Sequence, residues 1–489
     1  MSITIAQAIF VIYLLLVLAI GVIASRFTVH TPSDFYLANR RVGTLVLGLT
    51  FVATVLSAFT VLGIGGQVFT TGLGTFSFLA IAAVGYTLVF ATVGVTLYAI
   101  AREMDVVTPS EYVRKRYDSP MLGVLYLSVT GMFMIALITG QLTGGGIVLD
   151  ALMDIPYELA ITVMAVFMLV YIHIAGYRGV IWSDTLQSIV LFGALGGVVA
   201  YVLIARDANE IAIDTAEVTD GILQLAGPLD IWTPTFIITF ALAFVFGVPA
   251  YPHTIQRYFS GTDAATVHKS GFVFAMVAIP IYLFGAILGF WAIGMLPDPP
   301  DPDWVVPLIV DTLLHPVVFG VVMASATAAI MSTADSVALT MSSMISRGVY
   351  VPFVDPEANQ STQVRVTQMV LIVTILLGLI LAWIRPAGIF AIVAFAVVGL
   401  ATTSAPIFFG AYWRQATAAG AAVSLIVGPG LLIVFEMTSL LPSHPFGIHH
   451  GFISLVAAYV LFIGVSSLSA TPSAEAIQQH SRRFLQQSD

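Results

Sequence analysis

The chain has 489 residues, of which 59% are hydrophobic and only 9% are charged, and its formal net charge is −9. Soluble domains average about 25% charged residues, so this composition excludes a soluble enzyme, a disordered chain and a nucleic-acid-binding protein. It predicts an all-α integral membrane protein instead. The chain has no cysteine, which excludes disulfides, thiol catalysis and cysteine-based metal sites.

Thirteen apolar runs are long enough to cross a bilayer as helices, since one crossing takes about 20 residues. They lie near residues 5–24, 43–66, 74–101, 121–149, 157–175, 180–205, 232–254, 270–296, 316–346, 364–384, 387–411, 417–437 and 449–468. No basic segment precedes the first run, and the second follows it closely. We therefore interpret the first run as a retained helix and not as a cleaved signal.

The basic residues predict the topology, because an odd number of crossings places the two termini on opposite sides of the membrane. With the N-terminus outside, only Arg206 and Arg385 face outward, as the positive-inside rule requires. The remaining basic residues then face the cytoplasm: Arg26, Arg40, Arg41, Arg102, Arg114, Lys115, Arg116, Arg178, Arg257, Lys269, Arg347, Arg365, Arg414, Arg482 and Arg483. We expect a multi-pass protein of the cell membrane with a cytoplasmic C-terminus.

The parts outside the membrane are short. They comprise an acidic external loop at 206–231, a proline-rich segment at 297–304 and a polar tail at 469–489. No GxxxxGK[ST] motif occurs, so any transport by this chain is driven by a gradient and not by ATP. No nucleophile–base pair indicates an enzyme. The short tail and the lack of a recognisable filter also argue against a sensor and a channel.

Two of the runs carry signs of a helix break. Pro249 and Pro252 lie in the run at 232–254, and proline removes a helical hydrogen-bond donor, so a break near 247–252 is predicted. The break in the run at 43–66 is less marked, because its centre contains no glycine or proline. Broken helices at matching positions of two halves are typical of transporters.

The run at 316–346 carries a hydroxyl-rich face. Ala329, Ser332, Thr333 and Ser336 follow an i, i+3, i+4, i+7 spacing and share one side of a helix. Two adjacent hydroxyls that face unwound backbone carbonyls would suit Na⁺. The alternative is that these side chains bond to their own helix or pack between helices.

Three of the ionisable residues inside the predicted spans are candidates for a functional role: Asp184, His253 and Asp335. Asp335 lies 12 residues before Arg347, about 18 Å along a helix, and an acid at that depth lines a pathway or pairs with a cation. The alternatives are a neutral, hydrogen-bonded Asp335, an interfacial Asp184 near a helix N-terminus and a structural His253. No acid and histidine pattern indicates a metal site.

Six segments match, in order and spacing, a known family. They are SDFYLANRR (33–41), TPSEYVRKRYD (108–118), GQLTGGGIVLD (140–150), AGYRGVIWSDTLQ (175–187), PHTIQR (252–257) and AAIMSTADS (328–336). Over about residues 1–468 the chain resembles the sodium:solute symporters, which have the leucine-transporter fold with an extra N-terminal helix. The resemblance implies an inverted repeat of five plus five helices, followed by two C-terminal helices. The resulting division is 1–42 (extra helix and cytoplasmic loop), 43–205 and 232–411 (the two repeats), 206–231 (external loop), 412–468 (C-terminal helices) and 469–489 (cytoplasmic tail).

The resemblance implies a sodium site and places a second cation site beside it. The sodium ligands are two carbonyls of the first core helix and a carbonyl and two hydroxyls of the eighth, at Ala53, Leu56, Ala329, Ser332 and Thr333. Two-sodium members of the family have a second site, which here matches Asp184, Ser332 and Ser336. Asp335 stands where those members have a hydroxyl, so this second carboxylate would strengthen cation binding or carry a proton.

The resemblance places the solute between the two broken helices. The candidate binding and gate residues are Ser57, Ala58, Phe59, Thr60, Gln141, Tyr251 and His253. The Pro-His pair resembles the carriers of pantothenate, acetate and other monocarboxylates such as pyruvate. The alternatives are a proline-like amino acid, a sugar, and an H⁺-coupled carrier that uses Asp184 and Asp335. The expected partners are a small solute, Na⁺ and the lipid bilayer, with no cofactor and no nucleic acid.

Overall fold

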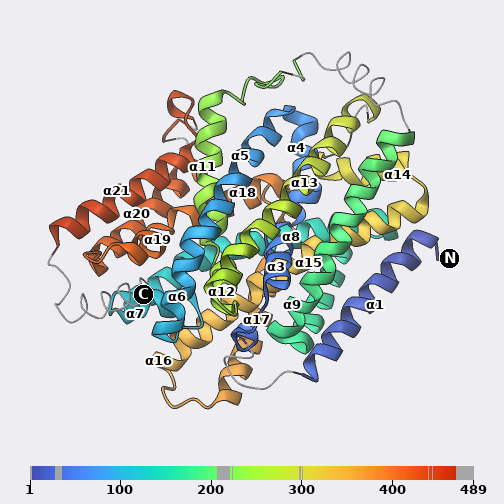
Figure 1. The fold of residues 1–489 in the computed structure, drawn as a ribbon. Helices are drawn as coiled ribbons and strands as arrows, with labels where there is room; N and C mark the ends of the chain where they lie inside the picture. The colour runs from blue at the N-terminus through green and yellow to red at the C-terminus, as the bar shows by residue number, and fades with distance from the viewer. Residues whose placement is uncertain are drawn as a thin grey trace.

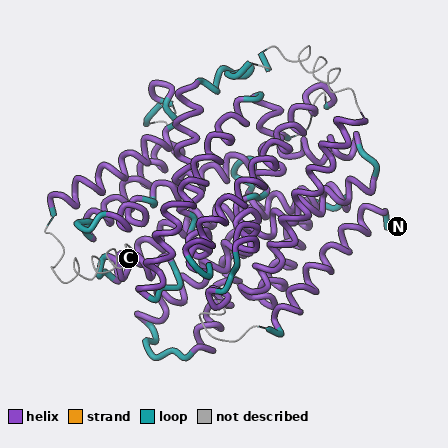
Figure 2. The backbone as a smooth tube through the Cα atoms, in the orientation of Figure 1, coloured by secondary structure: helices purple, strands orange, loops and turns teal. Residues whose placement is uncertain are grey.

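The computed structural model is built of helices. It describes residues 3–27, 36–205, 221–222, 224–296, 299, 301–438, 440–442 and 444–469. Within these ranges the extended structure is one isolated bridge between Val42 and Gly261, and helices fill most of the backbone (Figure 2). The predictions for 470–489, for most of 206–231 and for parts of 33–41 and 297–304 concern residues outside the described ranges.

Most helices overlap the predicted apolar runs, several of them as parts of a single run. They are α1 (Ile5–Ser25), α3 (Thr44–Val55), α4 (Ile64–Thr71), α5 (Gly74–Val89), α6 (Val95–Met104), α8 (Pro120–Met153), α9 (Tyr157–Ala205), α11 (Pro234–Ala250), α12 (Pro252–Ser260), α13 (Ala264–Met295), α15 (Pro316–Ile345), α17 (Gln360–Ile384), α18 (Ile389–Thr402), α19 (Ala405–Tyr412), α20 (Ala418–Met437) and α21 (His450–Leu468). Helix α1 lies at one edge of the molecule and α20 and α21 lie at the opposite edge, while α3, α8, α12 and α15 occupy the middle (Figure 1).

Helices α7 (Pro109–Arg116) and α14 (Val305–Leu313) lie outside the predicted apolar runs, and the sequence analysis did not predict either. Helix α7 begins with a capping box, in which Thr108 and Glu111 satisfy each other's backbone N–H groups. Helix α14 precedes α15. At eight and nine residues, both are too short to cross a bilayer, so a search for long apolar runs does not detect them.

The two predicted helix breaks are present. The chain bends by 62° between α3 and the π-helical turn Phe59–Gly63 that leads into α4, and by 51° between α11 and α12. Pro252 is the first residue of α12, where its missing N–H costs no hydrogen bond. In the first break Leu56 is extended, with φ −81° and ψ 121°, although no proline or glycine interrupts the chain there.

Ten described helices are long and apolar enough to cross a membrane, and the two bent pairs raise that number to 12. Helix α9 counts once among them, yet it covers two predicted runs over its 49 residues. Its backbone leaves helical geometry at Gly176, where φ is 56°, a conformation that glycine adopts without the strain that a Cβ atom brings. The predicted number of thirteen crossings stays a prediction.

Candidate functional site

The first helix break presents backbone carbonyls at the end of α3. The last carbonyls of a helix have no intrahelical donor, and the chain turns away after Val55, so the carbonyls from Ala53 to Leu56 need other partners. The N–H of Ser57, the group that would continue the helix toward Ala53, instead donates to the Thr60 hydroxyl at 3.3 Å. The break therefore leaves a group of buried oxygen acceptors in the centre of the molecule.

The hydroxyls of Ser332 and Thr333 on α15 point at these carbonyls. Ser332 Oγ donates to the Ala53 carbonyl at 2.7 Å and lies 3.1 Å from the carbonyl of Ala329. Thr333 Oγ1 lies 3.3 Å from the Leu56 carbonyl and 3.4 Å from that of Ala53. The structure thus brings together all five residues that the sequence analysis assigned to the sodium site.

These five residues offer five neutral oxygens from two helices, with both side chains buried, and the Thr54 carbonyl, which the sequence analysis did not include, also lies 3.3 Å from Thr333 Oγ1. Hard cations prefer oxygen ligands, and the C-terminal end of α3 contributes the partial negative charge of its helix dipole. A cation would replace the hydroxyl hydrogens as the partner of the carbonyls. This set of oxygen ligands suits a monovalent cation such as Na⁺, and it contains no carboxylate of the kind that divalent cations usually need.

The two helix breaks enclose a small cavity of about 10 Å³, which is room for a single water molecule. Ser57 and Phe59 from the first break and Tyr251 from the second line it, together with Thr333 of the sodium cluster. The other predicted solute residues, Ala58, Thr60, Gln141 and His253, are buried but are not part of the cavity wall. The predicted solute position therefore holds little free space in this structure.

Side-chain oxygens satisfy the backbone N–H groups at the start of the second half of the first broken helix. Gln141 Oε1 on α8 accepts from the Ala58 N–H at 2.9 Å, and the Ser57 hydroxyl accepts from the Phe59 N–H at 3.3 Å. The half-helix therefore donates to neutral oxygens at a place suited to an anion. Gln141 reaches this position from a different helix.

The start of α12 has a different character. Its N-cap residue, Tyr251, makes no side-chain capping bond, and the Tyr251 and His253 rings lie 4.8 Å apart. Both ring nitrogens of His253 and the Thr254 hydroxyl are buried without a hydrogen-bond partner. Buried polar groups are usually bonded, so these groups are free to bind a polar ligand.

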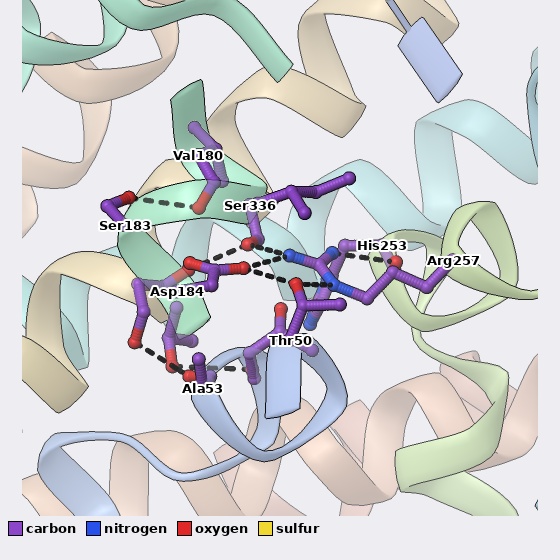
Figure 3. Close-up of polar contacts among 12 residues, drawn as sticks. Thr50, Ala53, Val180, Ser183, Asp184, His253, Arg257 and Ser336 are labelled. Atoms are coloured by element: carbon purple, nitrogen blue, oxygen red, sulfur yellow. Dashed lines mark hydrogen bonds and ion pairs between the residues drawn. The ribbon is translucent and has the colours of Figure 1, made fainter. Parts of the chain in front are cut away.

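A group of buried charged residues lies one helical turn from the neutral sodium cluster (Figure 3). The Arg257 guanidinium on α12 pairs with Asp184 on α9, with 2.8 Å between Nη2 and Oδ2, and neither side chain is exposed. The same Nη2 lies 2.6 Å from Ser336 Oγ on α15, and Nε lies 3.0 Å from Thr50 Oγ1 on α3. Both carboxyl oxygens of Asp335 are buried without a hydrogen-bond partner.

This arrangement corrects one step of the topology argument. Arg257 was counted among the cytoplasmic basic residues, but α12 continues the span of α11 and buries Arg257 completely. The sequence analysis also missed Thr50 and the role of Arg257. A signal was available, since an acid inside a membrane span needs a cationic partner and Arg257 follows directly on the predicted break.

A sequence model of the sodium:solute symporter family matches residues 35–428. The chain belongs to the sodium:solute symporter family. The resemblance drawn from the six sequence segments is therefore confirmed. Symporters move solutes across a membrane and are not enzymes, as the absence of a nucleophile–base pair predicted.

Characterised sodium:solute symporters align with this chain over almost their whole length. The sodium/pantothenate symporter of Escherichia coli (strain K12) is 29% identical, and the alignment covers 89% of this chain and 92% of the relative. That of Haemophilus influenzae is 27% identical, with 90% and 93% covered. The sodium/proline symporter of Haemophilus influenzae is 24% identical, with 96% and 95% covered.

Two solved structures show the fold. A Na⁺-coupled sialic acid symporter, in a substrate-bound outward-open state, superimposes with a TM-score of 0.76 at 19% identity, over 96% of this chain and 99% of that one. Mhp1, a nucleobase-cation-symport-1 family transporter, gives a TM-score of 0.57 at 14% identity, over 92% and 99%. The expected leucine-transporter-like fold is confirmed, and the chain is a Na⁺-coupled solute symporter that crosses the plasma membrane several times.

Proposed function

We propose that this symporter binds its coupling Na⁺ through the carbonyls of Ala53, Leu56 and Ala329 and the hydroxyls of Ser332 and Thr333. The observation that carries the proposal is the contact of both hydroxyls with the carbonyls of the broken α3, at 2.7 Å for Ser332 and 3.3 Å for Thr333. An ion in this position joins α3 to α15. It holds the first helix break in the shape that the solute then meets.

We propose a monocarboxylate such as pantothenate, acetate or pyruvate as the solute. Two features of the site support this choice. The N-terminus of α12 carries the positive end of its helix dipole, and the unpartnered His253 and Thr254 lie beside it. A carboxylate at the first break would take the Ala58 N–H from Gln141 Oε1. The sodium/pantothenate symporters also have higher identity to this chain than the sodium/proline symporter described above.

We propose that the chain crosses the membrane thirteen times, with an external N-terminus. The length of α9 supports this number of crossings. Its 49 residues would extend about 70 Å as one straight helix, more than twice the roughly 30 Å of the hydrocarbon core. The bend at Gly176 lets the segment cross the membrane twice. The 12 candidate crossings include α9 once, so counting it twice gives 13, in agreement with the proposed five-plus-five repeat over 43–205 and 232–411.

The transport cycle follows from these contacts. Na⁺ first joins α3 and α15, the solute then binds between the two broken helices, and inward opening separates the Na⁺ ligands because they belong to different helices. The gradient of Na⁺ thus drives uptake without covalent chemistry. A monocarboxylate accompanied by more than one cation would carry net positive charge inward.

The test is uptake by purified protein in liposomes, with labelled pantothenate, acetate, pyruvate, proline and glucose in parallel. We expect one carboxylate to accumulate when an inward Na⁺ gradient is imposed and not when it is absent. Accumulation of proline or glucose would retain Na⁺ coupling and refute the carboxylate assignment. Uptake driven equally well by a pH gradient without Na⁺ would favour the H⁺-coupled alternative, in which Asp184 and Asp335 carry the coupling ion.

A further inference from the structure

Arg257 contacts four structural elements through one buried guanidinium group. Nη2 donates to Asp184 Oδ2 on α9 at 2.8 Å and to Ser336 Oγ on α15 at 2.6 Å. Nε donates to Thr50 Oγ1 on α3 at 3.0 Å, and Nη1 donates to the His253 carbonyl on α12 itself at 3.1 Å. Four of the five N–H groups of the guanidinium therefore have partners.

The partners of Arg257 are the groups that a second cation would need. Asp184 and Ser336 are two of the residues that match the second site of two-sodium members, and both bond to the same Nη2. The Ser336 hydroxyl uses its own hydrogen to bond the Ser332 carbonyl at 2.7 Å, and Thr50 Oγ1 donates to Asp184 Oδ2. The guanidinium therefore already bonds the oxygens of Asp184, Ser336 and Thr50 that a second cation would need.

The charge of the group is permanent, because arginine stays protonated in proteins. A Na⁺ ion on the same Asp184 oxygen would lie within a few ångströms of this charge in a buried place where repulsion is poorly screened. It would also have to displace at least two charge-assisted hydrogen bonds, which are the stronger kind. Arg257 and a second Na⁺ thus compete for Asp184 Oδ2, while Oδ1 of the same carboxylate is buried without a hydrogen-bond partner.

We infer that the Asp184 site is a cation site filled by the protein itself, with the Arg257 guanidinium in the place of a second Na⁺, so that this symporter binds one Na⁺ per chain. This rests on the proposed function, since it takes the Ser332 and Thr333 cluster as the site of that one ion. The tethered cation, as we call the Arg257 guanidinium, links α12 to α3, α9 and α15. An ion would make the same links but would leave the protein in every cycle.

The direct test is the number of sodium ions that the purified protein binds, measured with ²²Na⁺ and no solute. We expect one ion per chain, and none in the double variant Ser332→Ala/Thr333→Ala. Two ions per chain in the unaltered protein would overturn the inference and leave Na⁺ coupling intact, whereas one ion retained by the double variant would overturn the proposed sodium site on which the inference rests. No saturable binding by the unaltered protein would instead overturn the proposed function.

A second variant tests the tethered cation itself. Arg257→Ala releases the oxygens of Asp184, Ser336 and Thr50, and we expect the bound sodium to rise from one ion per chain to two. Adding Asp184→Asn to this variant removes the carboxylate and should return the number to one. A purely structural pair predicts no added ion in Arg257→Ala, and that result in the folded variant would overturn the inference.

The matched control is Arg347→Gln. Arg347 also pairs with a buried acid, since its Nη2 lies 2.8 Å from Glu111 Oε1, but this pair lies away from the sodium cluster, between α7 and the end of α15. The control variant should still bind one ion. A second ion in this variant would mean that any lost arginine adds sodium binding, and it would overturn the interpretation of Arg257→Ala.

Discussion

Removing a hydroxyl from the sodium cluster gives the most direct test of its assignment. Ser332→Ala deletes the oxygen that lies 2.7 Å from the Ala53 carbonyl, and Thr333→Ala deletes the oxygen that lies 3.3 Å from the Leu56 carbonyl. Each variant leaves four of the five proposed ligands. The helix itself should be intact, because alanine is the strongest helix former.

The expected magnitude follows from the charge of the ion. A contact between a neutral oxygen and a charged group contributes about 1.5–3 kcal/mol, and each 1.4 kcal/mol is a factor of ten in an equilibrium constant. The Na⁺ concentration that gives half-maximal uptake should therefore rise roughly 10- to 150-fold in each variant. The maximal rate at saturating Na⁺ should change less.

The assay is initial uptake by proteoliposomes over a range of external Na⁺ concentrations. Thr333→Ser keeps the hydroxyl and should stay close to the unaltered protein. Ser342→Ala is the control for loss of a buried serine on the same helix, since its hydroxyl bonds the Ala338 carbonyl of α15 at 2.6 Å. If both alanine variants keep the sodium dependence of the unaltered protein, Na⁺ does not bind here.

Three further predictions concern the frame around the site. Gly144→Ala should lower the melting temperature by the equivalent of about 1–3 kcal/mol, because its new Cβ would lie 2.6 Å from the Ala58 Cβ; Gly131→Ala on the same helix, with 3.5 Å to its nearest neighbour, should not. Asp335→Asn should raise the melting temperature, since a buried carboxyl without a partner is costly, and a loss of uptake in this variant would instead show that Asp335 takes part in coupling. Burial raises the pKa of the Asp303 carboxyl, which bonds the first N–H of α18. The protonated Asp303 carboxyl therefore stabilises the fold at pH values below the ordinary pKa of aspartate. This stabilisation is lost as the pH rises through the raised pKa of Asp303 in the folded protein. The melting temperature of the unaltered protein should fall relative to Asp303→Asn from pH 4 to pH 7, and a constant difference would contradict this.

Much of the fold could be predicted from the sequence because a membrane imposes a simple rule on it. Each crossing needs a long apolar run, and the described long helices coincide with those runs. The break at Pro252 was equally visible, since proline cannot continue a helix. Helices α7 and α14 were missed because a short helix outside the hydrocarbon core leaves no such run.

The site was predictable only where adjacent residues carry the information. Ser332 and Thr333 are neighbours on one helix face, so spacing alone brought them together. The pairing of Arg257 with Asp184 depends on where the fold places α12 relative to α9, because the two residues are 73 positions apart in the chain. Counting Arg257 by its position near the end of an apolar run therefore placed it in the wrong environment.

The two helix breaks differ in what maintains them. In a helix continuous through α11 and α12, Pro252 would lack one hydrogen bond and its ring would crowd the preceding turn, so the residue itself favours the bend. In α3 no residue forbids a straight helix, and the bend is held by hydrogen bonds, among them the one from the Ala58 N–H to Gln141 on the neighbouring α8. Loss of this hydrogen bond would remove one restraint on the bend. The break before α12 is thus favoured by its own proline, whereas the break after α3 depends on contacts with neighbouring helices. The second of these breaks is the one that presents the carbonyls of Ala53 and Leu56.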